Sequence, residues 1–124
     1  MEEYSKQVMS LGMTLLELLS EALGLDRNNL IEMECAKGLR LLGHYHPPCP
    51  EPELTMGSVR HTDGSFITVL LQDQIGGLQV SFEGQWVDVS PVHGALVVNA
   101  GDLLQACTKC FLRCLFLLQK GFTY

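Results

Sequence analysis

Apolar residues recur at three- and four-residue intervals near the start of the chain, a spacing typical of an amphipathic helix. The apolar stripe consists of Val8, Leu11, Leu15, Leu18, Leu19 and Ala22. Gly24 is a suitable residue for the end of this helix. Asn29, with Glu32 three positions later, resembles a capping box in which Asn replaces the usual Ser or Thr, and it predicts a second short helix ending at Gly38. The pattern therefore predicts a helical segment over residues 1–38.

From residue 39 onward the pattern changes to short apolar runs separated by turn residues, which is typical of β-strands. The runs cover residues 39–46, 66–71, 78–82, 86–89 and 95–99. Pro47-Pro48 would end the first strand, and Glu83-Gly84-Gln85 predicts a hairpin between two of the others. Short strands with frequent turns favour a barrel, a sandwich or a jelly roll.

A third pattern begins at about Ala106. Residues 106–124 contain three of the five cysteines and no acidic residue, and they show neither clean alternation nor a clear helix cap. Cys107, Cys110 and Cys114 could suggest a zinc or iron–sulfur site, but a structural zinc site needs four ligands, usually in two pairs. We therefore favour three accidental thiols in an apolar tail.

Composition and charge narrow the classes of function. The chain has 124 residues and a net charge of −6, with its basic residues scattered, which argues against a nucleic-acid partner and against an anionic membrane surface. The longest apolar run is far too short to span a bilayer. The acidic N-terminus lacks the positive region of a signal peptide, so we expect a cytoplasmic protein with reduced cysteines.

His61 and Asp63 are the most informative candidates for chemistry. Side chains two residues apart point to the same side of an extended segment. Two histidines and one carboxylate on one face of Fe(II) leave positions open for reaction. Asp63-Gly64 is also a good turn dipeptide, so the pair alone leaves both interpretations open. The third ligand has no candidate downstream, because no histidine follows His93.

The segments around this pair carry a resemblance to a known family. They read His-Tyr-His-Pro-Pro-Cys-Pro-Glu-Pro-Glu-Leu-Thr at 44–55, Phe-Ile-Thr-Val-Leu-Leu-Gln-Asp at 66–73, Gly-Gly-Leu-Gln-Val at 76–80, Trp-Val-Asp-Val at 86–89 and Gly-Ala-Leu-Val-Val-Asn-Ala-Gly-Asp at 94–102. In order and spacing they closely resemble the plant non-haem iron, 2-oxoglutarate-dependent dioxygenases. The nearest branch is that of the 1-aminocyclopropane-1-carboxylate oxidase homologues, which is also similar to desacetoxyvindoline 4-hydroxylase.

The resemblance implies a mainly β fold with N-terminal helices, in which residues 39–105 form a partial double-stranded β-helix, or jelly roll. Residues 1–38 would pack on the roll as a helical segment, and residues 106–124 would be a divergent tail. It also implies Fe(II) held by His61 and Asp63, 2-oxoglutarate as co-substrate, and oxidation of a small-molecule substrate, as in plant secondary metabolism.

The chain also departs from the family pattern. The second histidine ligand is expected at roughly position 117, where Leu117 stands. The Arg-x-Ser that holds 2-oxoglutarate is expected beyond Tyr124, and Arg113, the nearest Arg, has no Ser two residues on. His46 replaces a family tyrosine and is our candidate 2-oxoglutarate contact. His44 shares a strand face with His46, and His93 is expected in a solvated turn.

We therefore expect a chain truncated at both ends, with weak or absent activity. A splice, frameshift or gene-model error would explain the tail. One alternative is a non-catalytic remnant that associates with itself or with a partner through open strand edges or the apolar helix stripe. The others are a functionless fragment and a true 1-aminocyclopropane-1-carboxylate oxidase that uses ascorbate.

Overall fold

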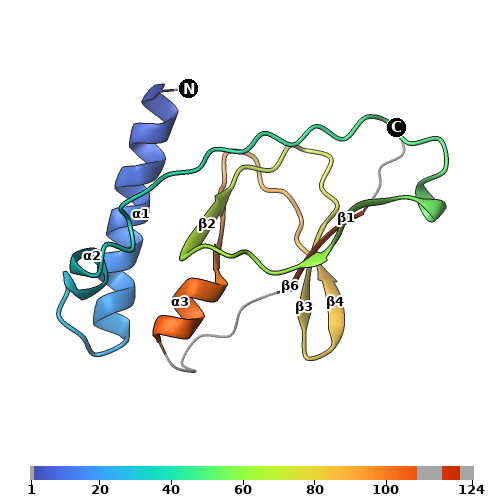
Figure 1. The fold of residues 1–124 in the computed structure, drawn as a ribbon. Coiled ribbons are helices and arrows are strands. Elements are labelled where there is room, and N and C mark those ends of the chain that lie inside the picture. The colour runs from blue at the N-terminus through green and yellow to red at the C-terminus, as the bar shows by residue number, and fades with distance from the viewer. Residues whose placement is uncertain (1, 109–115, 121–124) are drawn as a thin grey trace. The chain divides into compact units, whose positions relative to one another are not determined.

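The computed structural model describes residues 2–108 and the backbone of residues 116–120. Two compact units divide the chain, Met1–Gly43 and His44–Tyr124, and each is described by itself. The first is helical. The second contains the strands and the short helix α3 (Figure 1). The predicted fold class, mainly β with N-terminal helices, is confirmed.

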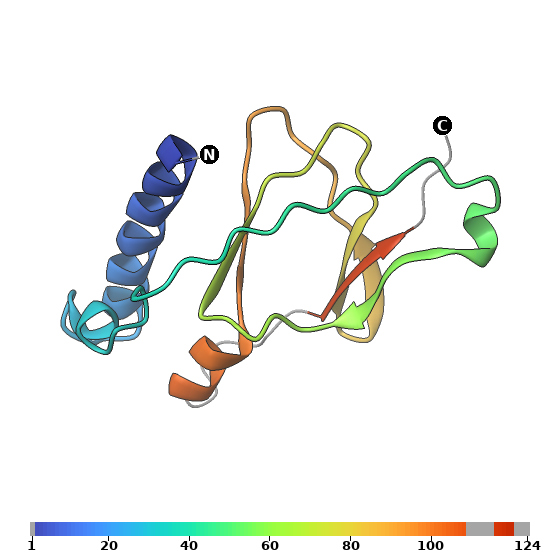
Figure 2. The same ribbon diagram turned by 45° about the horizontal axis from the view of Figure 1, so that its top comes forward.

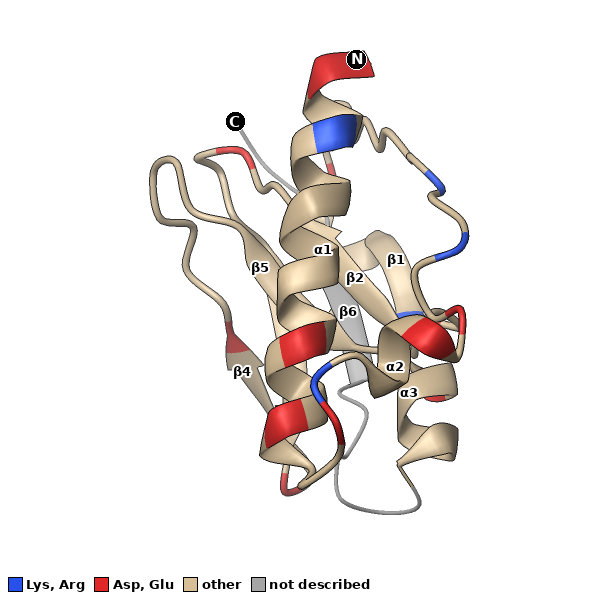
Figure 3. Ribbon diagram, turned by 90° about the vertical axis from the view of Figure 1, so that its left-hand side faces the viewer, with Lys and Arg blue, Asp and Glu red and all other residues tan. Residues whose placement is uncertain are grey.

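The first unit consists of the helices α1 (Glu2–Ala22) and α2 (Asn29–Glu32). The predicted long helix is confirmed, and it ends where Gly24 takes a φ of +71°, a left-handed conformation that glycine adopts without strain. Charged residues are spread along α1, and the Lys and Arg residues occur singly along the ribbon (Figure 3). Among the described residues, no helix combines the length and the apolar character needed to cross a bilayer.

The predicted capping box at Asn29 is wrong. Asn28 is the N-cap residue of α2 and makes no side-chain capping hydrogen bond. Its own N–H donates to Asp26 Oδ1 at 3.0 Å, so the turn before the helix is held from two residues upstream. The helix also ends at Glu32, before the expected Gly38, because Glu34 has a φ of +61° and cannot continue a right-handed helix.

Ser20 of α1 supplies the cap that α2 lacks. Its hydroxyl is fully buried, donates to the Leu16 carbonyl at 2.9 Å and accepts the Leu30 N–H at 3.2 Å. Leu30 is itself 1% exposed, so water cannot replace this acceptor. The contact between the two helices therefore depends on a hydrogen bond as well as on apolar packing.

Ser20→Ala should lower the free energy of unfolding of the helical unit by about 1–3 kcal/mol, because it leaves the Leu30 N–H buried without an acceptor. Urea unfolding followed by helical circular dichroism measures the change. Ser10→Ala, at an exposed position of the same helix, is the control and should stay within about 0.5 kcal/mol of the parent. Equal effects of the two substitutions would contradict the capping role.

The second unit contains two antiparallel sheets. One has the strand order β1-β6-β3-β4 and the other pairs β2 with β5, and Figure 2 shows β6 between β1 and the β3–β4 hairpin. The strands are β1 (Met56–His61), β2 (Ile67–Leu70), β3 (Leu78–Phe82), β4 (Gln85–Asp88), β5 (Val97–Ala100) and β6 (Phe116–Lys120). The 3₁₀-helix η1 (Pro52–Leu54) precedes β1, and α3 (Asp102–Cys107) follows β5.

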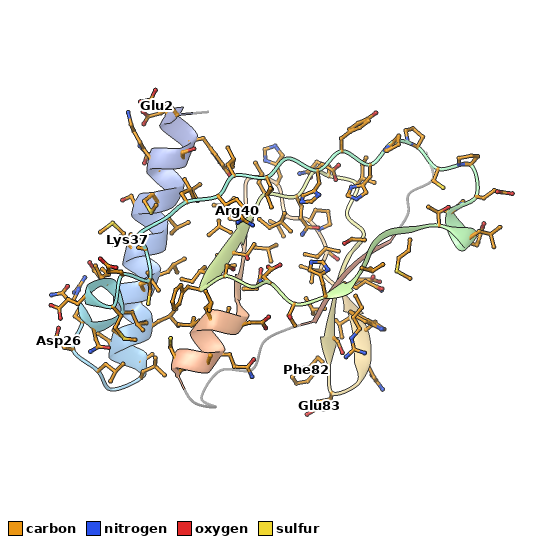
Figure 4. The ribbon with its side chains drawn as sticks, viewed as in Figure 1. Glu2, Asp26, Lys37, Arg40, Phe82 and Glu83 are labelled. Atoms are coloured by element: carbon orange, nitrogen blue, oxygen red, sulfur yellow. The ribbon has the colours of Figure 1, made fainter. Side chains whose placement is uncertain are left out.

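The predicted hairpin is confirmed, and its loop is two residues long. Glu83 and Gly84 have φ values of +49° and +81°, and Phe82 pairs with Gln85, which already belongs to β4 (Figure 4). Positive φ at both central residues is the requirement of a type I′ turn, whose twist matches that of the flanking strands.

Two assignments made from the apolar pattern differ from the structure. Residues 39–46, predicted as a strand, have no regular secondary structure. Leu42 and Tyr45 are 66% and 84% exposed, so this run does not gain the burial that its apolar character led us to expect. Conversely, β1 and β6 were not predicted. Met56–His61 mixes apolar and polar residues without forming an apolar run, and β6 lies in the segment without alternation.

Few apolar side chains of the second unit are buried. Leu78 and Leu104 are the buried apolar residues among those described there, together with the polar Gln79 and Asn99. Val59, Phe82 and Val87 are 70%, 61% and 47% exposed. The strands therefore form a framework whose apolar surface is only partly covered by the described residues.

Candidate metal centre

The end of β1 positions His61. Its Nδ1 lies 2.7 Å from the carbonyl oxygen of Val59. A carbonyl oxygen can only accept, so Nδ1 carries the proton in this contact, and in a neutral ring Nε2 holds the free lone pair. The hydrogen bond thus selects the tautomer in which Nε2 can bind a metal ion.

Asp63 lies beside that lone pair, as the two-residue spacing predicts. His61 Nε2 and Asp63 Oδ1 are 3.7 Å apart, and their side chains are 42% and 20% exposed. This distance is too long for a hydrogen bond. One ion at about 2.1 Å from each atom can bridge donors up to about 4.2 Å apart. The two atoms therefore fit a shared ion at a site that is partly exposed to solvent.

The second carboxylate oxygen of Asp63 is already engaged. Asn99 of β5, which is 7% exposed, donates from Nδ2 to Asp63 Oδ2 at 2.8 Å. The two residues are 36 positions apart in the sequence. The interaction leaves Oδ1 as the oxygen that faces His61.

The backbone after Asp63 is tied to the segment after β5. The Asp102 N–H donates to the Asp63 carbonyl at 2.8 Å and the Leu103 N–H to the Ser65 carbonyl at 3.2 Å. Gly101 donates to the Phe66 carbonyl at 2.9 Å. We call residues 62–66 and 99–103, with the hydrogen bonds between them, the clasp. It holds Asp63 through both its backbone and its side chain.

A side-chain hydrogen bond adds a further tie within the clasp. Thr62 Oγ1 donates to Asp102 Oδ2 at 2.9 Å, and Asp102 is the first residue of α3. The residue between the two candidate ligands is therefore anchored to a helix start rather than to the candidate ligands themselves. The start of α3 and the end of β1 are fixed to each other at this point.

No third donor joins the pair among the described residues. Within 2–108 and 116–120, no group of three or more His, Cys, Asp or Glu side chains gathers closely enough to hold a metal ion. Of the tail cysteines, Cys107 is exposed, whereas Cys110 and Cys114 lie outside the described residues, as does Arg113.

Position 117 lies in β6, the strand that pairs with β1. β6 pairs with β1 in antiparallel orientation, and Leu117 is the register partner of His61. The position at which the family resemblance expects the missing histidine is therefore opposite the histidine that is present.

The other histidines have separate environments. His44 and His46 stack on each other, with ring centroids 6.3 Å apart and an angle of 15° between the rings, in the segment without secondary structure. A role of His46 in binding 2-oxoglutarate stays a prediction. His93 is exposed in a turn, as expected.

Reasoning from the sequence assigned no role to Thr62, Asn99, Gly101 or Asp102, which form most of the clasp. One signal was available for Asn99, a polar residue that directly follows the apolar run Leu96-Val97-Val98 on a predicted strand. A polar side chain on a buried strand requires a hydrogen-bond partner.

Comparison with protein families identifies one match over most of this region. The family model described as the 2OG-Fe(II) oxygenase superfamily matches residues 38–115. This range contains the candidate pair and the clasp, and it extends into the segment expected to diverge.

Two curated relatives from Arabidopsis thaliana are similar to most of the chain. The chain is 65% identical over 109 residues to 1-aminocyclopropane-1-carboxylate oxidase homolog 1, which covers 88% of the chain and 30% of the relative. It is 67% identical over the same length to homolog 2, again with 88% and 30% covered. The chain thus spans about 30% of the length of these relatives.

Solved structures agree on the architecture. A crystal structure of JOX2 in complex with 2OG, Fe and JA superimposes with a TM-score of 0.86 at 28% identity, covering 98% of this chain and 37% of that one. A 2OG-Fe(II) oxygenase family protein from Caulobacter crescentus gives a TM-score of 0.77 at 26% identity, covering 98% and 39%.

Proposed function

We propose a metal-binding role for this chain, which belongs to the 2OG-Fe(II) oxygenase superfamily. In this proposal, His61 and Asp63 are protein ligands of an Fe(II) ion. The family uses Fe(II) and 2-oxoglutarate. The observation that carries the proposal is the 3.7 Å separation of His61 Nε2 and Asp63 Oδ1. It is supported by the hydrogen bonds that occupy the remaining polar atom of each side chain.

Each ligand has a distinct task in this proposal. Fe(II) and 2-oxoglutarate, when bound, supply the oxidising chemistry that the family applies to small molecules. His61 offers a neutral nitrogen, held in one tautomer by the Val59 carbonyl. Asp63 contributes one negative charge, so that part of the metal's positive charge remains for an anionic co-substrate. The clasp keeps the Asp63 carboxylate in place before metal binding.

For the chain alone we propose weak or absent oxidation of substrate. Only two donors meet among the described residues, and losing even an indirect partner of a metal ligand typically costs about 10–100-fold in affinity or activity. A substrate for a whole protein containing this segment is proposed only as a small molecule. His46 is proposed as a contact to 2-oxoglutarate.

Asp63→Ala should weaken binding of Co(II), an air-stable probe for the Fe(II) site, by at least about tenfold, because it removes one of two ligands. Isothermal titration measures the dissociation constant. Glu53→Ala removes a negative charge from an exposed position of η1 and should leave that constant unchanged.

The two parts of this proposal can fail separately. Equal affinity for Co(II) in Asp63→Ala and in the parent would show that the pair is not the metal site. Succinate formed from 2-oxoglutarate by the parent and lost in Asp63→Ala would instead overturn the proposed lack of activity.

A second candidate is a non-catalytic role in association. The exposed apolar side chains Val59, Phe82 and Val87 favour it, because apolar surface on exposed strands promotes pairing with another chain. Sedimentation would then give a mass that rises with protein concentration, and Asp63→Ala would leave that mass unchanged.

A further inference from the structure

Asn99 of β5 donates a side-chain hydrogen bond to Asp63, the proposed metal ligand. It is the register partner of Thr68 in the β2–β5 pair, and its side chain is largely buried. A carboxylate oxygen only accepts, so Asn99 presents its NH₂ group, not its carbonyl oxygen, to Asp63. The donor belongs to a strand rather than to a flexible loop, and its direction is therefore fixed by the sheet.

The carboxylate of Asp63 is made unequal by this contact. Oδ2 accepts from Asn99 at 2.8 Å, whereas Oδ1 lies 3.7 Å from His61 Nε2. The Asp63 backbone is held by the Asp102 N–H at 2.8 Å, so the carboxylate stays between Asn99 and His61. Its two oxygens are chemically equivalent, and in either orientation one of them accepts from Asn99 while the other faces His61. One oxygen thus binds Asn99, and the other is available to an ion.

We infer that Asn99 is a positioning residue that makes Asp63 a one-oxygen ligand and thereby sets which ions the site prefers. The inference rests on the proposed function of the His61–Asp63 pair. Small divalent ions bind nitrogen and oxygen donors at about 2.0–2.2 Å, a distance that one carboxylate oxygen supplies. Ca²⁺ binds at about 2.3–2.6 Å and readily accepts both oxygens of one carboxylate. Holding Oδ2 away from the ion therefore disfavours Ca²⁺ relative to the smaller ions.

Asn99→Ala tests this with two metal titrations on the full chain. Binding of Co(II) should weaken by about 10–100-fold, the usual effect of removing a partner of a metal ligand. Binding of Ca²⁺ should stay equal or become tighter, because Oδ2 becomes available as a second oxygen. The ratio of the two dissociation constants should therefore shift by at least tenfold, which a general loss of structure would not produce.

Thr62→Val is the matched control. It removes another side-chain hydrogen bond of the clasp, the 2.9 Å bond from Thr62 to Asp102, without touching the Asp63 carboxylate. Its Co(II) and Ca²⁺ affinities should change together or not at all. Both titrations are repeated in the background of Leu117→His, a substitution chosen to add a third donor at the register partner of His61.

A measurement without metal covers the case in which Asn99→Ala does not fold. In the parent chain, the side-chain amide protons of Asn99 should exchange slowly in NMR spectra, and Asp63→Ala should remove that protection. Rapid exchange in the parent would overturn the inference, since the hydrogen bond on which it depends would not persist in solution.

The outcomes separate this inference from the proposed function. If Asp63→Ala leaves Co(II) binding unchanged in both backgrounds, the proposed metal site fails and the inference fails with it. If Asp63→Ala weakens binding but Asn99→Ala changes neither metal, or both equally, the site stands and the role of Asn99 is overturned.

Discussion

Leu117→His should tighten binding of Co(II) by at least about 100-fold, because it adds a third protein donor to the proposed pair of His61, at the end of β1, and Asp63. Position 117 is the register partner of His61, and side chains at directly opposite positions of an antiparallel pair have Cβ atoms about 4.5–5.5 Å apart. A histidine there could reach an ion held by His61 and Asp63. Since loss of an indirect partner alone costs about 10–100-fold, gain of a direct ligand should exceed that range.

Leu118→His is the matched control for this prediction. It introduces the same side chain one residue later, and a shift of one residue in a strand moves a side chain to the other face of the sheet. Isothermal titration of both variants should show tight Co(II) binding for position 117 alone. Equal affinities for the two variants would contradict the register argument.

Leu117→His should bind metal but convert little 2-oxoglutarate to succinate. The 124-residue sequence contains no Arg-x-Ser, which the family resemblance assigns to holding 2-oxoglutarate through a bidentate arginine. We therefore expect a bound ion with little succinate formed. Abundant succinate would show that another residue holds the co-substrate.

Gly101→Ala should lower the free energy of unfolding of the strand unit by at least about 3 kcal/mol, the upper range for inserting atoms into packed structure. Gly101 is buried, and a Cβ placed on it would overlap the carbonyl oxygen of Ser65 and lie 2.7 Å from that of Asp63. Both contacts are backbone atoms. They can move only by lengthening the hydrogen bonds of the clasp, each of which contributes about 1 kcal/mol.

Urea unfolding followed by tryptophan fluorescence, through Trp86 of β4, measures this loss. Gly64→Ala is the control within the same loop, because a Cβ there would meet nothing within 4 Å, and it should stay within about 0.5 kcal/mol of the parent. The variants should also differ in Co(II) affinity, since only Gly101→Ala disturbs the backbone that carries Asp63. Identical stability in both variants would show that the clasp can open without cost.

The sequence pattern predicted the elements that depend mostly on interactions between neighbouring residues. The periodic apolar stripe predicted α1, and Glu83-Gly84 predicted the hairpin, because helix periodicity and a type I′ turn depend on neighbouring residues. Residues 39–46 show the opposite case: an apolar run suited to a strand has no regular structure where it lies. A strand forms only where another strand supplies hydrogen bonds, and no pattern within the run contains that information.

The sequence by itself determined which candidate donor groups this chain offers. It placed an imidazole and a carboxylate two residues apart, and it carried the series of segments that predicted the family and the fold. Only the tertiary structure decided how the pair is held: Asn99 meets Asp63 from 36 residues away, Gly101 leaves room for the Ser65 carbonyl, and β6 brings Leu117 opposite His61. The physical reason is that donor identity is a property of single residues, whereas donor geometry is set by contacts between segments that only folding brings together.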